Sequence, residues 1–155
     1  MTTRQLPAVE EIRALVGHRF PGGTYTIAQW ENFLLTECTG SAPLPEDMAH
    51  PVALFHVPIL GAGTSIGEMF ALGQADSDSS IGIESYDWEF FAPLREEQPY
   101  RVDAQITEAD RCEANGRIYD RIAFRFDLTT FDLTKEDGVH AARTTITWHY
   151  NRGRR

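Results

Sequence analysis

The sequence predicts an α+β domain in which an antiparallel sheet of about five strands packs around a long central helix. The first observation is an apolar run at residues 57–72, which is long enough for about four turns of helix. The second is a change of pattern beyond residue 80, where apolar and polar residues alternate. The third is the length of 155 residues, which suits one domain with its own core. We therefore expect a single domain over residues 1–155, with a disordered basic tail at residues 151–155.

The first third of the chain is expected to hold two short helices separated by a brief strand. Residues 7–16 place apolar side chains at helical spacing, and residues 21–27 read as a turn and a strand. A second helix is predicted from residue 28 until Gly40 stops it. Three apolar side chains share one face of that helix: Trp30, Phe33 and Leu34. Residues 41–51 are rich in proline, which predicts a loop.

The central helix is expected to begin near Val57 and to run to about residue 72. Proline is well tolerated in a first helical turn, where its missing N–H would have had no partner, and Pro58 fits that position. Gly63 and Gly67 are four residues apart and so lie on one face of a helix. We expect these glycines to let a strand backbone approach the helix closely.

The second half of the chain is expected to form the sheet. The alternating segments, which bury one face and expose the other, are residues 80–93, 100–107, 117–131 and 139–150. Five aromatic side chains are predicted to point into the core from these segments: Tyr86, Trp88, Phe90, Phe124 and Trp148. The polar side chains opposite them are expected on the solvent face.

Composition and charge exclude several classes of function. A net charge of −9 argues against a nucleic-acid partner, because phosphate binding needs a basic surface. No apolar run approaches the roughly 18 residues that span a bilayer, and the start lacks a signal-like pattern. We therefore expect a soluble, cytoplasmic protein with no membrane partner. Cys38 and Cys112 lie in no zinc-like or disulfide-like pattern, and neither a metal nor a cofactor is predicted.

Two segments resemble a known family. Residues 88–106, WEFFAPLREEQPYRVDAQI, are similar to the segment of MaoC-like hydratases and dehydratases in which an aromatic-rich strand ends in proline before a short turn. Residues 34–63 resemble the catalytic region of that family, where a helix ends in Thr/Ser-Gly-Asp, an Asn-Pro-x-His follows, and a His-Gly pair opens the central helix. The resemblance implies the hotdog fold, a curved antiparallel sheet wrapped around a helix. The cone-shaped α+β barrel of small polyketide cyclases is the rival fold.

The resemblance also implies a chemistry. Such enzymes interconvert enoyl thioesters and 3-hydroxyacyl thioesters, carried by coenzyme A or by an acyl carrier protein. In the family an Asp and a His move the protons, and the N-terminus of the central helix polarises the thioester carbonyl. A dimer with another hotdog chain, identical or different, is expected because pairing would cover exposed sheet edges. Fatty acid, polyketide and steroid side-chain substrates all remain open.

The sequence departs from the family at the residues that matter most. Thr39 and Gly40 match, but Ser41 stands where the family has Asp, and Glu46 stands where it has His. His56 matches the His-Gly pair, with valine in place of glycine. This pattern is similar to accessory subunits of two-chain dehydratases, which have lost the Asp/His pair and bind the acyl chain.

The candidate site residues follow from this mapping. Asp47, His50 and His56 are the candidates for catalysis, because they are the nearby residue types able to move protons. Three further residues are expected to contact the substrate: Val57, Gly61 and Trp88. Arg121 and Arg125 share a face of one predicted strand, where they are expected either to meet the carrier's negative charge or to pair with acidic neighbours.

Three rival functions remain open at this point. The first is a self-sufficient homodimeric hydratase that uses Asp47, His50 or His56. The second is a hotdog thioesterase whose water-activating carboxylate is Glu46, Asp47 or Glu68. The third is a protein that binds acyl thioesters without turning them over.

Overall fold

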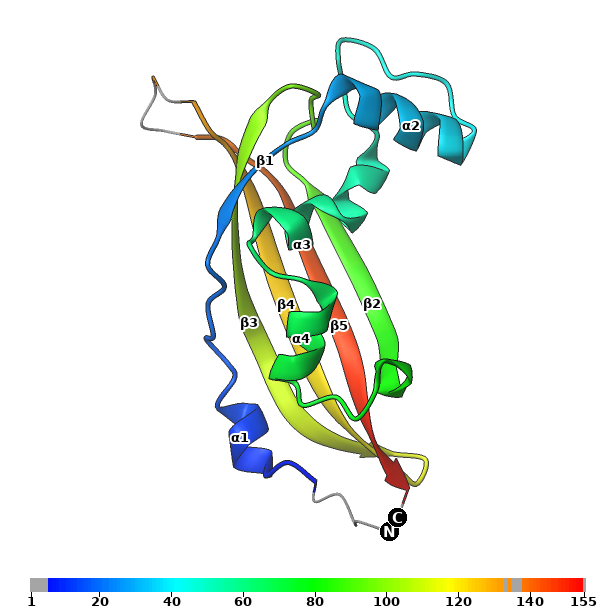
Figure 1. Ribbon diagram of the computed structural model, residues 1–155, viewed down its shortest axis with the longest axis vertical. Helices are drawn as coiled ribbons and strands as arrows, with labels where there is room; N and C mark the ends of the chain where they lie inside the picture. The colour runs from blue at the N-terminus through cyan, green and yellow to red at the C-terminus, as the bar shows by residue number, and fades with distance from the viewer. Residues whose placement is uncertain (1–5, 133, 135–137, 155) are drawn as a thin grey trace.

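The computed structural model describes residues 6–132, 134 and 138–154. Within these residues, one antiparallel sheet has the strand order β1-β3-β4-β5-β2. Its strands are β1 (Gly23–Thr26), β2 (Ile81–Phe90), β3 (Pro99–Ala114), β4 (Arg117–Thr130) and β5 (His140–Arg154). The three long strands curve behind the helices α3 (Val57–Gly61) and α4 (Ile66–Leu72), as Figure 1 shows. The predicted sheet and α+β class are confirmed.

The central helix is not continuous. It begins at Val57 and ends at Leu72 as predicted, but residues 62–65 separate α3 from α4. Gly63 has φ +70°, a left-handed conformation that a helix does not contain, and Ser65 caps α4 by accepting a hydrogen bond from the Glu68 N–H. An apolar pattern with helical spacing does not reveal such a break, because the spacing shows which positions are apolar and not whether the backbone between them stays helical.

A different glycine makes the close approach to the sheet. A Cβ on Gly61 would lie 2.5 Å from Val102 Cγ2 and 3.2 Å from Tyr25 Cβ, so only a glycine fits there. Gly67 has open space around it, since the nearest atom to its Cβ would be Ser65 Oγ at 3.9 Å. The predicted role of close packing therefore belongs to Gly61 instead of Gly67.

The remaining helices lie at the two ends of the sheet. They are α1 (Val9–Arg13), α2 (Gln29–Thr39), η1 (Pro51–Phe55) and η2 (Asp78–Ser80). In Figure 1, α2 projects beyond one end of the sheet and α1 lies alongside β3 at the other. Gly40 ends α2 in the left-handed conformation, as expected of a helix C-terminus. The predicted apolar face of α2 points to solvent, with Trp30, Phe33 and Leu34 all exposed.

The core lies between the sheet and the helices α3 and α4. Phe124 and Trp148 are buried as predicted, and Tyr86 and Trp88 are half-buried against the core. The prediction for Phe90 is wrong, because its side chain is 43% exposed. Phe90 is the last residue of β2, which is an edge strand.

The C-terminus departs most from expectation. The predicted disordered tail is wrong for the described residues, because β5 continues through Arg154 and pairs with β4. Arg152 is buried, and its Nε donates to Asp120 Oδ2 at 2.7 Å. Its guanidinium also donates to the carbonyls of Gly73 and Gln74 at the end of α4. A basic tail thus becomes part of the sheet because one arginine satisfies a buried carboxylate.

Candidate functional site

The candidate site is built where α2, the following loop, η1 and the start of α3 meet. Asn32 on α2 holds this junction together: its Oδ1 accepts a hydrogen bond from the His50 N–H at 2.8 Å. Its Nδ2 donates to the carbonyl of Met48 at 3.1 Å and to Glu96 Oε2 at 2.8 Å. One amide side chain therefore fixes the loop that carries the sequence-predicted residues.

His50 is committed to structural contacts. It is the N-cap of η1, where its Nδ1 accepts a hydrogen bond from the Val52 N–H at 3.1 Å. Because Nδ1 is an acceptor, a neutral His50 carries its proton on Nε2, which lies 3.3 Å from Thr39 Oγ1. Ser41 Oγ lies 2.8 Å from the same hydroxyl. Ser41, which stands where the family that the sequence resembles has Asp, therefore belongs to a network of two hydroxyls and one imidazole, and no carboxylate of the described residues is hydrogen-bonded to it.

Asp47 and Glu46 lie on the surface of the loop. Both have left-handed backbone conformations, with φ 58° and 56°, and both side chains are exposed. Their contacts to the neighbouring loop are made by backbone carbonyls: the Asp47 carbonyl accepts from the Glu96 N–H, and the Glu46 carbonyl accepts from Arg95 Nη1. Asp47 also lines a cavity of about 190 Å³ between α2 and the loop. Among the described residues, no hydrogen bond or ion pair joins any two of Asp47, His50 and His56.

His56 lies in a different cluster, with two residues that the sequence analysis did not single out. His56 Nε2 lies 2.7 Å from Glu31 Oε2, and the Tyr25 hydroxyl donates to the same oxygen at 2.7 Å. Glu31 Oε1 accepts from the Ala28 N–H at 3.3 Å. The three side chains come from β1, α2 and the N-cap of α3.

Burial and hydrogen bonding set the charge of this cluster. The side chain of Glu31 is 12% exposed and that of His56 is 30% exposed. Burial by itself would raise the pKa of Glu31, but hydrogen bonds from His56, Tyr25 and the Ala28 N–H outweigh it and lower the pKa below its usual value. Burial, together with the neighbouring Glu31, raises the pKa of Tyr25 to about 12. The cluster therefore holds an ionised carboxylate between two donors.

Solved structures resemble this arrangement of elements, although no protein-family model and no curated protein matches the sequence. A chain of the ChsH1–ChsH2 complex from Mycobacterium tuberculosis matches with a TM-score of 0.66 and 12% identity, over 94% of this chain and 89% of that chain. The hotdog fold of this neighbour is the fold of the chain. A monoamine oxidase regulatory protein from Archaeoglobus matches with a TM-score of 0.65 and 11% identity, over 98% and 99%. The HadBC (3R)-hydroxyacyl-ACP dehydratase complex from Mycobacterium tuberculosis matches with a TM-score of 0.59 and 15% identity, over 86% and 96%.

These neighbours are MaoC-like hotdog proteins, which confirms the predicted resemblance at the level of the fold. Matching structures also include an R-hydratase and an acyl-CoA hydrolase, so the hotdog fold here is shared by proteins of different activity. The identities are low, and the function of this chain has to be argued from its own residues.

The three predicted substrate contacts lie in different surroundings of the hotdog fold. The side chain of Val57 is completely buried, and Gly61 is buried against β3. Trp88 is half-buried on β2, and its indole N–H is buried with no hydrogen-bond partner among the described residues. Val57 and Gly61 belong to the same short helix as the His56 cap, whereas Trp88 lies in an edge strand.

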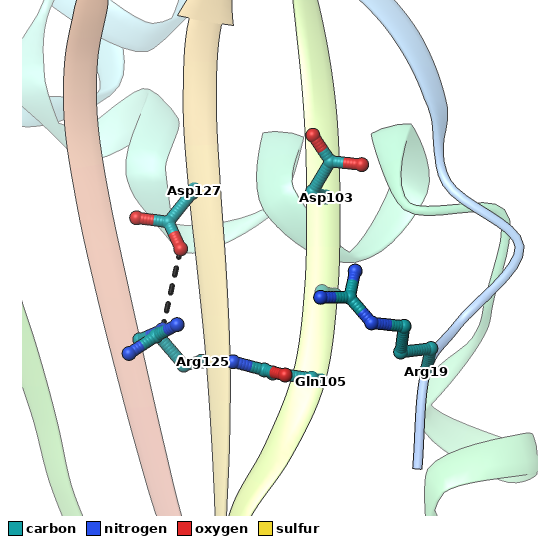
Figure 2. A pocket seen from close by; sticks show the side chains of 6 residues that line it. Arg19, Asp103, Gln105, Arg125 and Asp127 are labelled. Carbon is teal, nitrogen blue, oxygen red and sulfur yellow. Dashed lines mark ion pairs between the residues drawn. The ribbon is translucent and has the colours of Figure 1, made fainter. Parts of the chain in front are cut away.

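The arginines on the outer face of the sheet are paired. Arg121 lies between Glu84 and Glu108 and forms an ion pair with each. Arg125 lies 3.3 Å from Asp127, and Figure 2 shows this pair beside a small cavity that Arg19 and Asp103 also line. Of the two expectations for Arg121 and Arg125, pairing with acidic neighbours is the one that the structure bears out. Among the described residues, no helix is long and apolar enough to cross a membrane, and no group of His, Cys, Asp and Glu is suited to hold a metal ion.

Proposed function

We propose that this chain is one subunit of a two-chain hotdog hydratase or dehydratase that interconverts 3-hydroxyacyl and enoyl thioesters. It supplies the surface that binds the acyl thioester, and a sister hotdog chain supplies the paired acid and imidazole. The carrier is coenzyme A or an acyl carrier protein.

The observation that carries the proposal is the state of the loop before α3. Ser41 and Glu46 replace the Asp and His of the catalytic members that the sequence resembles. His50 lies near Ser41, yet its Nδ1 caps η1 and its Nε2 faces a hydroxyl, so it has no carboxylate to complete an acid–base pair. A hydratase needs a base that takes a proton from water and an acid that protonates the α carbon. In this loop neither role is filled, because Ser41 and Glu46 stand at the Asp and His positions and His50 has no carboxylate partner among the described residues.

The exposed apolar residues support a partner chain. Ile83 and Phe90 on the edge strand β2 are exposed, as is Phe91 directly after it. An edge strand with free backbone groups and apolar side chains is a surface that proteins cover by pairing. Phe55, which is 54% exposed, stacks on Tyr86 of β2 and so extends this surface toward the start of α3. Two of the solved structures it resembles are complexes of two named chains.

The test is hydration of crotonyl-coenzyme A, which is measured as a loss of ultraviolet absorbance. The assay is run with this chain alone and with a co-expressed hotdog chain that is encoded next to it. We expect turnover only in the mixture, and we expect Asp47→Asn and His50→Asn in this chain to leave it unchanged. Asparagine at position 50 keeps an N-cap acceptor, so the variant should fold. Repeating the assay with an acyl carrier protein thioester distinguishes the two carriers.

The other outcomes identify the rival functions. Hydration by the chain alone that is lost in either variant would contradict the proposal and assign a self-sufficient hydratase. Binding of the thioester without turnover, alone or in the mixture, would identify a non-catalytic binder.

A further inference from the structure

We propose that Tyr25, Glu31 and His56 form a water-activating site that belongs to this chain alone and hydrolyses acyl thioesters. This activity goes beyond the two-chain hydration proposed above and uses neither Ser41 nor Glu46, which stand at the family's Asp and His positions. His56 is the general base of the proposed site, while Glu31 and Tyr25 are positioning residues.

The hydrogen bonds fix which nitrogen of His56 is basic. An ionised carboxylate only accepts hydrogen bonds, so His56 Nε2, at 2.7 Å from Glu31 Oε2, must carry a proton. A neutral His56 therefore keeps its lone pair on Nδ1. Nδ1 has no hydrogen-bond partner among the described residues, in contrast to Nδ1 of His50, which caps η1. This is the carboxylate–imidazole arrangement that orients a general base.

The donors around Glu31 keep it ionised. The Tyr25 hydroxyl remains protonated at any working pH, because its pKa is raised to about 12, and it donates permanently to Glu31 Oε2. Its ring also packs edge-on against His56, with centroids 6.2 Å apart and planes at 80°. Tyr25 thus restrains both the charge of the carboxylate and the orientation of the imidazole.

The base is accessible and has apolar surface beside it. The side chain of His56 is 30% exposed although its carboxylate partner is nearly buried. Leu60, four residues further along the helix and therefore on the same side, is 57% exposed, and Phe55 is 54% exposed. Exposed apolar side chains next to a base suit a substrate that joins an acyl chain to a reactive carbonyl.

The proposed step is hydrolysis because one proton carrier is sufficient for it. His56 Nδ1 takes a proton from water as the water oxygen bonds to the thioester carbonyl carbon. The carbon–sulfur bond then breaks, its electron pair leaves on sulfur, and the proton on Nδ1 is returned to the thiolate. The products are a carboxylic acid and a thiol. A thiolate leaves readily because its conjugate thiol has a pKa of about 8.5, whereas hydration would need a second group to protonate the α carbon.

The experiment measures thiol release from butyryl-coenzyme A by the purified full-length chain, using Ellman's reagent. The butyryl group has no double bond, so hydration cannot contribute to the signal. We expect release above the buffer rate, a loss of at least about 100-fold in His56→Gln, and a loss of at least about 10-fold in Glu31→Gln, where the tautomer is no longer fixed. Tyr25→Phe should lower kcat by about 2- to 10-fold with KM unchanged, because it removes one hydrogen bond from a positioning residue. Glu37→Gln, an exposed carboxylate on the same helix, is the matched control and should behave as the wild type.

Two results would overturn the inference: no release above the buffer rate, or release that persists in His56→Gln. If His56→Gln does not fold, the imidazole nitrogen chemical shifts of the wild type decide. They should report a proton on Nε2 and a lone pair on Nδ1 that responds to a non-hydrolysable thioether analogue of butyryl-coenzyme A; the opposite tautomer or no response would contradict it. Thiol release from butyryl-coenzyme A tests only the hydrolysis site, and hydration of crotonyl-coenzyme A tests only the two-chain proposal. Either proposal can therefore fail while the other stands.

Discussion

Glu31 shows how a single residue couples the stability of this protein to pH. Its carboxylate accepts three hydrogen bonds, and its pKa in the folded protein lies below the ordinary value of 4.5. A folded pKa that is lower than the unfolded one stabilises the protein above the unfolded pKa. That contribution is lost as the pH falls through the folded pKa.

Glu31→Gln should therefore lower the free energy of unfolding by about 1 kcal/mol at neutral pH and by less in acid. Urea unfolding between about pH 7 and pH 3 would measure the difference from the wild type, which should shrink below about pH 5. Glu37→Gln, with an exposed side chain, should show no such trend. A difference that stays constant down to pH 3 would contradict the assigned hydrogen bonds.

At the same scale, the sequence identified one member of the cluster and missed two. His56 stood out because it precedes the central helix. Glu31 follows Ala28 by three residues at a helix start and reads as an ordinary capping position, and Tyr25 reads as a strand residue. Nothing in a single sequence signals that Tyr25 and His56, which are far apart in the chain, contact the same carboxylate oxygen of Glu31. Only the fold brings them together.

At the scale of elements, Gly61 sets how closely α3 approaches β3. A Cβ there would lie 2.5 Å from Val102 Cγ2, and Val102 is completely buried on β3, a strand paired on both sides. We expect Gly61→Ala to destabilise the protein by about 1–3 kcal/mol, because the strand has no room to move. Gly67→Ala is the matched control: it lies in α4 with open space around it, so alanine should stabilise the protein by about 0.5–1 kcal/mol.

Thermal unfolding of both variants measures this contrast. Equal effects at the two positions would show that the helix–strand distance is not set by Gly61. The contrast also explains a limit of the sequence analysis. Helical spacing predicted that the helical segment begins at residue 57 and ends at residue 72, but it assigned a close approach to Gly67 and none to Gly61, because spacing alone does not show that the helix breaks at Gly63.

At the scale of the whole molecule, a buried ion-pair network joins segments near the two ends of the chain, which lie side by side in Figure 1. Asp120 on β4 is completely buried between Arg111 on β3 and Arg152 on β5. Arg111 also donates to the carbonyl of Pro7, and Arg152 donates to the carbonyl of Gln74. Asp120 and Gln74 lie 32 and 78 residues before Arg152 in the sequence, so the basic tail carried no visible sign that one of its arginines is buried.

Arg152→Met should destabilise the protein by about 3 kcal/mol, because it leaves the buried Asp120 with only one cationic partner. Arg117→Met replaces an exposed arginine at the start of β4 and should change the free energy of unfolding by less than about 0.5 kcal/mol. Denaturant unfolding of both variants provides the measurement. A small effect at Arg152 would show that Arg111 alone satisfies the carboxylate.

The exposed edge strand β2 is expected to affect association with another chain and not folding. Ile83 is 67% exposed, next to an irregularity in the pairing of β2 with β5. A lysine on an exposed edge opposes strand pairing, because its charge would have to be desolvated in the interface. We expect Ile83→Lys to weaken association with the proposed sister hotdog chain by at least about 10-fold in sedimentation experiments, with an unchanged thermal midpoint. Ile66→Lys, at an exposed position on α4, is the control and should associate as the wild type does.

Equal weakening by both variants would show that the interface includes α4 as well as β2. No weakening by either variant would show that β2 is not part of the interface.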